Sequence, residues 1–293
     1  MLSDVLKTGI LESLQTRRLL MPNTAKTYVS LLSSVYKQMG QSEEDPETFF
    51  VERVKQVLAH IDNMKIRTQA TTLAALWSFT GVEEYRVQMR KVSDEIREIY
   101  KDQLVEEHRR GSWVTFHQIS EIGRAYHTRF TNHPSLETAT NALITGLMSG
   151  MYPGCPPRRL MDYTEMKVRN FDADDNYIND GVMIFNKYKT VKKDKEKGIV
   201  SQLQVPAEMV PIIEYVKKNT LSDYLLNNTL GAKFTSASLH KRLFSIFGFS
   251  VDMLRSIYLS EMHEGTPSIR DMESTAKNMG NSVGSQLGFY VKK

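Results

Sequence analysis

This chain of 293 residues has one cysteine, two tryptophans and no long apolar run. The single cysteine, Cys155, excludes an internal disulfide and any metal cluster built on cysteine. No apolar run approaches the length of a membrane span, and the N-terminal segment lacks the order of charge, apolar stretch and small residues of a signal peptide. These absences predict an intracellular protein with no membrane partner.

Charge of either sign is not in large excess. The formal net charge is +4 and the pI about 8.9, values that permit nucleic-acid binding without demanding it. With 41% hydrophobic and 25% charged residues, the composition is that of an ordinary globular protein, and the length favours two domains. No group of His, Asp and Glu has the spacing of metal ligands, so we expect neither a metal nor another cofactor.

The first third of the sequence has the pattern of successive helices. Apolar residues recur every three to four positions, and the segments between them carry helix start and stop signals. Asp45 and Pro46 form a cap and first turn for a helix that runs to Ile61, and Gly81 ends the next one. The polar stretch EEHRRGS is the best boundary in the chain. It predicts a first domain of residues 1–108 and a second of residues 112–293.

The second domain begins with two helices and then changes character. Pro156 and Pro157 break the helical register. Short strand patterns follow near residues 166–169, 182–188 and 199–205, the second after a turn at Asn179-Asp180-Gly181, and helices resume from Ala207. We therefore expect a mostly α fold with one small antiparallel β-sheet.

Three positively charged residues of this domain lie at the boundaries of, or within, its predicted elements. Arg159 follows the Pro-Pro break, and Asp162 lies three residues later, where its carboxylate can fix the arginine stem. Lys189 ends the second strand pattern, before the lysine-rich loop VKKDKEKG, and Arg255 lies within a helix. Taken singly, each has an ordinary structural explanation, as a surface ion pair, a solvated lysine or an arginine at a helix edge.

The C-terminal segment MGNSVGSQLGFYVKK raises a similar choice. Tyr290 and Phe289 can anchor the tail by packing their rings on the domain surface. A polar tail can also deliver a phenol as a covalent nucleophile. The tail alone leaves both possibilities open.

The order arginine, lysine, arginine, tyrosine resembles that of the tyrosine recombinase (phage integrase) family. The resemblance covers essentially the whole chain, and it implies a helical N-terminal DNA-binding domain followed by a tyrosine-recombinase-like catalytic domain. The residues that carry it are Arg159 in PPRRLMDYTEM, with Asp162 at the usual acidic position, Lys189 in FNKYKT, Arg255 in VDMLRSIYLS, and Tyr290 nine positions after Asn281. Because Arg158 and Arg159 are adjacent, the sequence does not settle which of them faces the site.

Two positions depart from the family pattern. Asp252 stands where the family has the histidine of His-x-x-Arg, and Asn281 stands where it has histidine or tryptophan. We expect Asp252 to pair with Arg255 and orient it, and Asn281 to donate a hydrogen bond to a phosphate oxygen, since an amide cannot shuttle protons.

The resemblance implies a specific chemistry at a DNA phosphodiester. The arginines hold the scissile phosphate, Lys189 protonates the departing 5′ oxygen, and Tyr290 forms a 3′-phosphotyrosine intermediate that a 5′ hydroxyl can religate. The predicted function is site-specific DNA recombination or integration. A type IB topoisomerase-like enzyme and a non-catalytic DNA-binding relic of the same scaffold remain as alternatives.

The resemblance also implies double-stranded DNA as partner, bound by a dimer or tetramer, in the cytoplasm or the host-cell compartment that contains the target. An origin from a virus or another mobile element fits this family. The candidate phosphate-binding residues are Lys187, Lys192, Lys193, Lys241 and Arg242.

Overall fold

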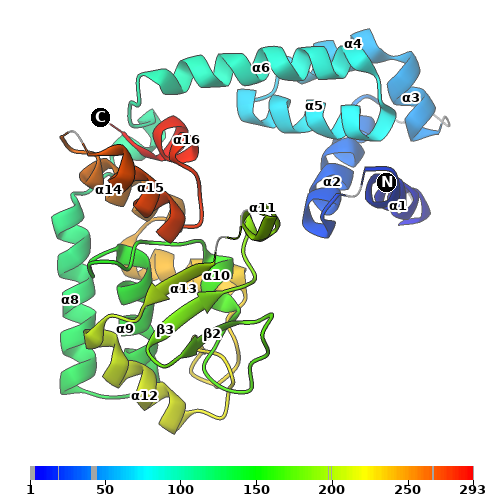
Figure 1. Cartoon of the computed structure of the whole chain (residues 1–293). Helices are drawn as coiled ribbons and strands as arrows, with labels where there is room; N and C mark the ends of the chain where they lie inside the picture. Colours follow the sequence, from blue (N-terminus) through cyan, green and yellow to red (C-terminus); the bar gives the residue numbers. More distant parts are fainter. Residues whose placement is uncertain are drawn as a thin grey trace. The chain divides into compact units, whose positions relative to one another are not determined.

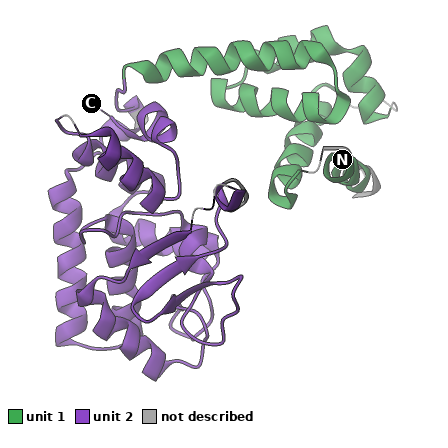
Figure 2. Ribbon diagram, in the orientation of Figure 1, with its two compact units in different colours: residues 1–102 green, residues 103–293 purple. Residues whose placement is uncertain are grey.

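The computed structural model describes residues 4–18, 20–40, 45–196, 198, 200–265 and 267–292. Its contacts divide the chain into two compact units, Met1–Asp102 and Gln103–Lys293 (Figure 2). The division falls shortly before the polar stretch that the sequence suggested as a boundary.

The first unit consists of helices around one apolar core. Leu32, Phe49 and Leu73 are fully or almost fully buried in it, and the hydroxyl of buried Tyr85 donates a hydrogen bond to the carbonyl of Phe50 at 2.7 Å. The helix expected to run on from Asp45 is instead interrupted, and its two parts meet at a non-helical residue, Arg53. The helices are α1 (Asp4–Arg18), α2 (Pro22–Gln38), α3 (Pro46–Glu52), α4 (Val54–Ile61), α5 (Ile66–Thr80) and α6 (Glu83–Lys101).

The second unit is built around α9 (Leu136–Ser149). A capping box at Ser135 starts this helix, and every residue from Thr138 to Ser149 is buried, which marks it as the central helix of the core. It packs against α8 and α12 (Figure 1). The other helices are α7 (Glu107–Arg110), α8 (Phe116–Asn132), α10 (Leu160–Thr164), α11 (Val191–Glu196), α12 (Val210–Asn219), α13 (Ser236–Phe247), α14 (Val251–Met262), α15 (Ile269–Asn278) and α16 (Val283–Ser285).

Within the described residues, no single helix has the length and apolar character needed to cross a membrane. One bent pair, α13 with α14, would qualify by length and composition only.

The sheet has four strands in the order β1-β2-β3-β4, namely β1 (Met166–Lys167), β2 (Asn176–Asn179), β3 (Val182–Phe185) and β4 (Ser201–Gln204). Asp180 and Gly181, both with positive φ, form the tight turn between β2 and β3 at the position that the sequence indicated. The mostly helical fold with one small sheet is confirmed. The sheet is mixed rather than purely antiparallel, because β2, a strand that the sequence pattern did not reveal, pairs in parallel with β1.

The lysine-rich segment after β3 also differs from the expectation. It forms the short helix α11 rather than an open loop. Lysine and glutamate have good helix propensity, and the Thr190 hydroxyl donates to the Asp194 carboxylate at 2.9 Å across the first turn.

Candidate active site

Two adjacent arginines at the start of α10 point in different directions. Arg158 is fully buried, and its Nε donates to Asp162 Oδ2 at 2.9 Å. Its guanidinium also lies 3.9 Å from the ring centroid of Phe185 in β3. Asp162 therefore fixes Arg158 rather than Arg159, contrary to the expectation from the sequence. Burial raises the pKa of the Asp162 carboxyl, and the Arg158 charge opposes that shift.

The buried guanidinium of Arg158 also connects elements that are distant in sequence. Its Nη1 donates to the carbonyl of Asn278, at the end of α15, at 2.6 Å and to Ser201 Oγ in β4 at 3.1 Å. Arg158 thus joins α10, β4 and α15 at one point, which makes it an anchor of the site rather than an exposed group.

The turn after α15 fits closely over both arginines. Gly280 has φ +61°, and a Cβ atom there would lie 2.7 Å from Arg158 Nη2. The Gly280 carbonyl accepts a hydrogen bond from Arg159 Nη1 at 2.6 Å. Only glycine satisfies both the backbone angle and the close approach.

Arg159 faces a cavity of about 610 Å³. Lys189, which is exposed in the segment between β3 and α11, and Asn281 line the same cavity. Two acidic residues, Asp194 and Glu273, lie on its wall as well. Three of the residues singled out from the sequence are therefore brought together, from α10, from the turn after β3 and from the turn after α15.

Arg255 lies behind Asn281, in the middle of α14, and is fully buried. In the orientation that satisfies its neighbours, the Asn281 amide accepts from Arg255 Nη2 at 3.1 Å, and its nitrogen faces the carbonyl of Ala276 at 3.2 Å. Arg255 Nε and Nη1 have no hydrogen-bond partner among the described residues. Burial lowers the pKa of this guanidinium. A buried cation with free donors is costly unless an anion approaches it.

Tyr290 lies against Arg255. The Arg255 Cζ atom is 4.6 Å from the centroid of the Tyr290 ring, a cation–π distance. The π-helical turn Gln286–Tyr290 leads into a tail that is docked in the described structure, since Lys292 N donates to Ser260 Oγ of α14 at 2.8 Å. Tyr290 packs partly buried beside Tyr258 and other residues of this small cluster. The structure therefore agrees with both interpretations of the tail. The Tyr290 ring packs on the domain, and it also contacts Arg255, a candidate catalytic residue.

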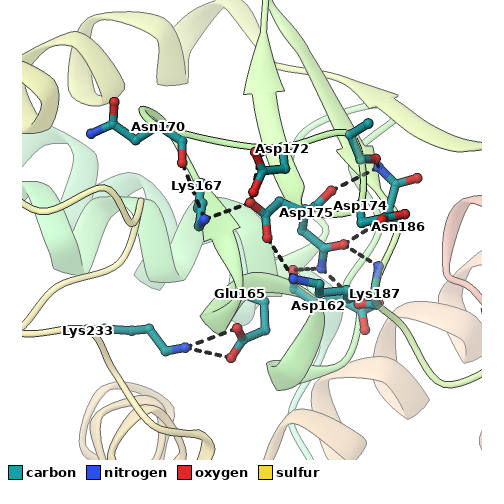
Figure 3. Close-up of polar contacts among 12 residues, drawn as sticks. Asp162, Glu165, Lys167, Asn170, Asp172, Asp174, Asp175, Asn186, Lys187 and Lys233 are labelled. Carbon is teal, nitrogen blue, oxygen red and sulfur yellow. Dashed lines mark hydrogen bonds and ion pairs between the residues drawn. The ribbon is translucent and has the colours of Figure 1, made fainter.

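The remaining predicted residues lie apart from this arrangement. Asp252 is exposed, and no described ion pair joins it to Arg255, whose side chain is buried. Lys187 makes an ion pair with Asp175 at 2.7 Å (Figure 3). Lys241 is exposed on α13, and the side chains of Lys192 and Lys193 lie outside the described residues.

Arg242, another predicted DNA-binding residue, is held by its own domain. Its Nε donates to Asn141 Oδ1 and its Nη2 to Glu137 Oε1, both at 2.7 Å. Among the described residues, no three His, Cys, Asp or Glu side chains are grouped in a way that could hold a metal ion.

Sequence reasoning missed the parts of the site that support it. Arg158 was only an alternative to Arg159, and Gly280 and Ser201 were not singled out. For Gly280 the sequence had a usable signal, because glycine is common at the position that follows the C-cap residue of a helix. The sequence has no comparable signal for Ser201, because its contact with Arg158 joins residues that are far apart in the chain.

The fold has recognisable solved counterparts. It resembles lambda integrase, solved as a dimer bound to a COC′ core site, with a TM-score of 0.54 and 14% identity over 98% of this chain and 76% of that chain. The chain has the tyrosine recombinase fold. XerA recombinase is also similar, with a TM-score of 0.41 and 13% identity over 98% of this chain and 94% of that one. No protein-family model and no curated protein matches the sequence.

The tyrosine recombinase fold expected from the order of Arg159, Lys189, Arg255 and Tyr290 is thus confirmed.

The Gly280 turn gives a test of how tightly the site is built. Gly280→Ala should lower the free energy of unfolding by about 1–3 kcal/mol, because the new Cβ would strain the backbone and press on Arg158. Gly284→Ala is the matched control, since a Cβ at Gly284 meets no atom within 4 Å. Urea unfolding of the full chain measures both variants. Equal stabilities for the two would show that the turn is looser than the structure indicates.

Proposed function

We propose that this protein is a site-specific DNA recombinase or integrase that cuts and rejoins DNA through a 3′-phosphotyrosine intermediate. The observation that carries the proposal is Arg255, a buried guanidinium without a carboxylate partner that contacts both Asn281 and the Tyr290 ring. A phosphate oxygen is an anionic acceptor to which such unpaired N–H groups can donate.

The proposed reaction proceeds in two matched steps. In the first, the Tyr290 oxygen attacks phosphorus in line and its proton passes to solvent. The bond from phosphorus to the 5′ oxygen breaks, and the Lys189 ammonium gives that oxygen a proton. In the second, a 5′ hydroxyl attacks the phosphotyrosine and returns its proton to the Lys189 amine, and the released phenolate takes a proton from solvent. Arg159 and Arg255 stabilise the negative charge on the non-bridging oxygens in both steps. The placement of Arg159 and Lys189 on one cavity supports this division of roles.

The proposed substrate is double-stranded DNA, bound by a dimer or tetramer. The solved lambda integrase dimer on its core site supports this assembly by analogy of fold. Among the candidate phosphate contacts whose side chains the structure describes, Lys241 is exposed, whereas Lys187 and Arg242 already have partners within the chain. The proposed location is the intracellular compartment that holds the target DNA, and the proposed origin is a virus or another mobile element.

A second candidate is a non-catalytic DNA-binding protein on the recombinase scaffold. The observation that favours it is the position of the two residues that replace family histidines. Asp252 is exposed, and the Asn281 amide contacts Arg255 and Ala276, so neither supplies a proton shuttle at the cavity. Adduct formation separates the two candidates.

The first test concerns the nucleophile. Wild-type protein incubated with a library of nicked duplexes should form a covalent protein–DNA adduct that survives denaturing electrophoresis. Tyr290→Phe should bind DNA as well as wild type and form no adduct, because it lacks the attacking oxygen. Tyr258→Phe is the matched control, since its ring belongs to the same cluster. An adduct that persists in Tyr290→Phe would assign the nucleophile elsewhere, and no adduct with wild type would favour the non-catalytic candidate.

The second test concerns the two arginines at the phosphate. Arg159→Ala and Arg255→Ala should each slow single-turnover cleavage by roughly a hundredfold or more, as losses of a preorganised charge donor do. Binding to long DNA should change much less, because other phosphate contacts remain. Arg124→Ala, on the exposed surface of α8, controls for the loss of one positive charge. Parallel loss of cleavage and binding in the site variants would indicate a structural role instead.

A further inference from the structure

Asn176, the first residue of β2, is fully buried and uses all of its hydrogen-bonding capacity. Its Nδ2 donates to the carbonyls of Asp162 at 3.0 Å and Lys187 at 2.9 Å. Its Oδ1 accepts from the backbone amides of Asn186 at 2.7 Å and Lys187 at 2.6 Å. An amide side chain has two donor hydrogens and two acceptor positions, and all four are occupied here.

These four contacts connect two parts of the candidate active site. The Asp162 carbonyl belongs to α10, the helix that starts directly after Arg159. The other three groups belong to the backbone of Asn186 and Lys187, three and two residues before Lys189. One buried amide therefore sets the spacing between the element that carries Arg159 and the turn that carries Lys189.

Hydrogen bonds and ion pairs of Asp175 and Asn186 also hold the turn of residues 186–187. Asp175 accepts from the amide of Asp172 and from the ammonium groups of Lys167 at 2.6 Å and Lys187 at 2.7 Å (Figure 3). The Asp172 hydrogen bond and the two lysines hold the pKa of Asp175 well below its usual range, so the carboxylate stays charged at neutral pH. Asn186 Nδ2 donates to the carbonyls of Ala173 at 2.8 Å and Asp175 at 2.9 Å.

A lysine that protonates a leaving group must be held at a defined distance from the phosphate, and a flexible four-carbon side chain does not provide that by itself. Lys189 is exposed and makes no described ion pair, so its backbone is the part that can be fixed. The buried contacts of Asn176 hold the backbone of Asn186 and Lys187, shortly before Lys189, because breaking them would leave several backbone groups unpaired in the interior.

We propose that Asn176 is a positioning residue for Lys189, acting through the turn of residues 186–187. The inference rests on the proposed function, in which Lys189 supplies the proton to the departing 5′ oxygen. In this role, Asn176 affects that proton transfer selectively and makes no contact with DNA.

The test compares two leaving groups in single-turnover cleavage. One substrate is a nicked duplex with the normal 5′ oxygen, and the other has sulfur at the bridging 5′ position. A thiol has a far lower pKa than an alcohol, so a thiolate leaves without a general acid. Asn176→Asp retains the side-chain shape and both acceptor contacts but loses both donors. It should cleave the oxygen substrate at least about tenfold more slowly than wild type, and the sulfur substrate at the wild-type rate.

Asn186→Ala provides a milder disturbance of the same turn. It removes the two side-chain hydrogen bonds to Ala173 and Asp175 and leaves the backbone contacts with Asn176 intact. The same selective loss, of smaller size, is expected, and this variant keeps the test valid if Asn176→Asp does not fold. Asn179→Ala, at the exposed end of β2, should cleave both substrates like wild type.

The outcomes separate the two proposals. If wild type forms the adduct and a folded Asn176→Asp or Asn186→Ala variant slows both substrates equally, or neither, the positioning role is overturned and the proposed function stands. If wild type forms no adduct with either substrate, the proposed function fails and the role of Asn176 fails with it.

Discussion

The buried ion pair between Arg158 and Asp162 is the interaction on which the candidate site depends. Both side chains are fully buried, and the arginine also reaches β4 and the end of α15. Removing one member of such a pair typically costs about 3–5 kcal/mol, because an uncompensated charge remains in the interior. The turn after α15, which carries Asn281, is therefore held in place by a residue that does not itself line the cavity.

The three arginines near the site differ in what satisfies them. Arg158 has a carboxylate, a hydroxyl and a carbonyl as partners, so its charge is balanced within the protein although its Nη2 atom has no described partner. Arg255 has an amide and an aromatic ring but no acid, and two of its nitrogens are unpaired. Arg159 donates to a single carbonyl at the edge of the cavity. In the proposed reaction, the phosphate binds between Arg159 and Arg255, and Arg158 supports the site.

The substitutions at the family histidine positions change how Arg255 is held. Asn281 contacts it directly, so the amide can orient the guanidinium without carrying a proton. Asp252 remains at the surface and makes no described ion pair with Arg255. In the proposed reaction, the proton for the leaving oxygen then depends on Lys189 alone, which increases the importance of the buried amide of Asn176 beneath its turn.

The sequence by itself determined most of the local structure. Helical periodicity, caps such as Asp45 and the Asp180-Gly181 turn are short-range signals, and each was readable before the fold was known. The order of Arg159, Lys189, Arg255 and Tyr290 was sufficient to predict the tyrosine recombinase fold.

Only the tertiary structure decided which of two adjacent arginines is buried, since that choice depends on Phe185, Ser201 and Asn278, all distant in the chain. The parallel pairing of β1 with β2 and the four contacts of Asn176 were undetectable for the same reason. Hydrogen bonds between distant segments leave no periodic pattern in the sequence, and they exist only after the segments have packed together.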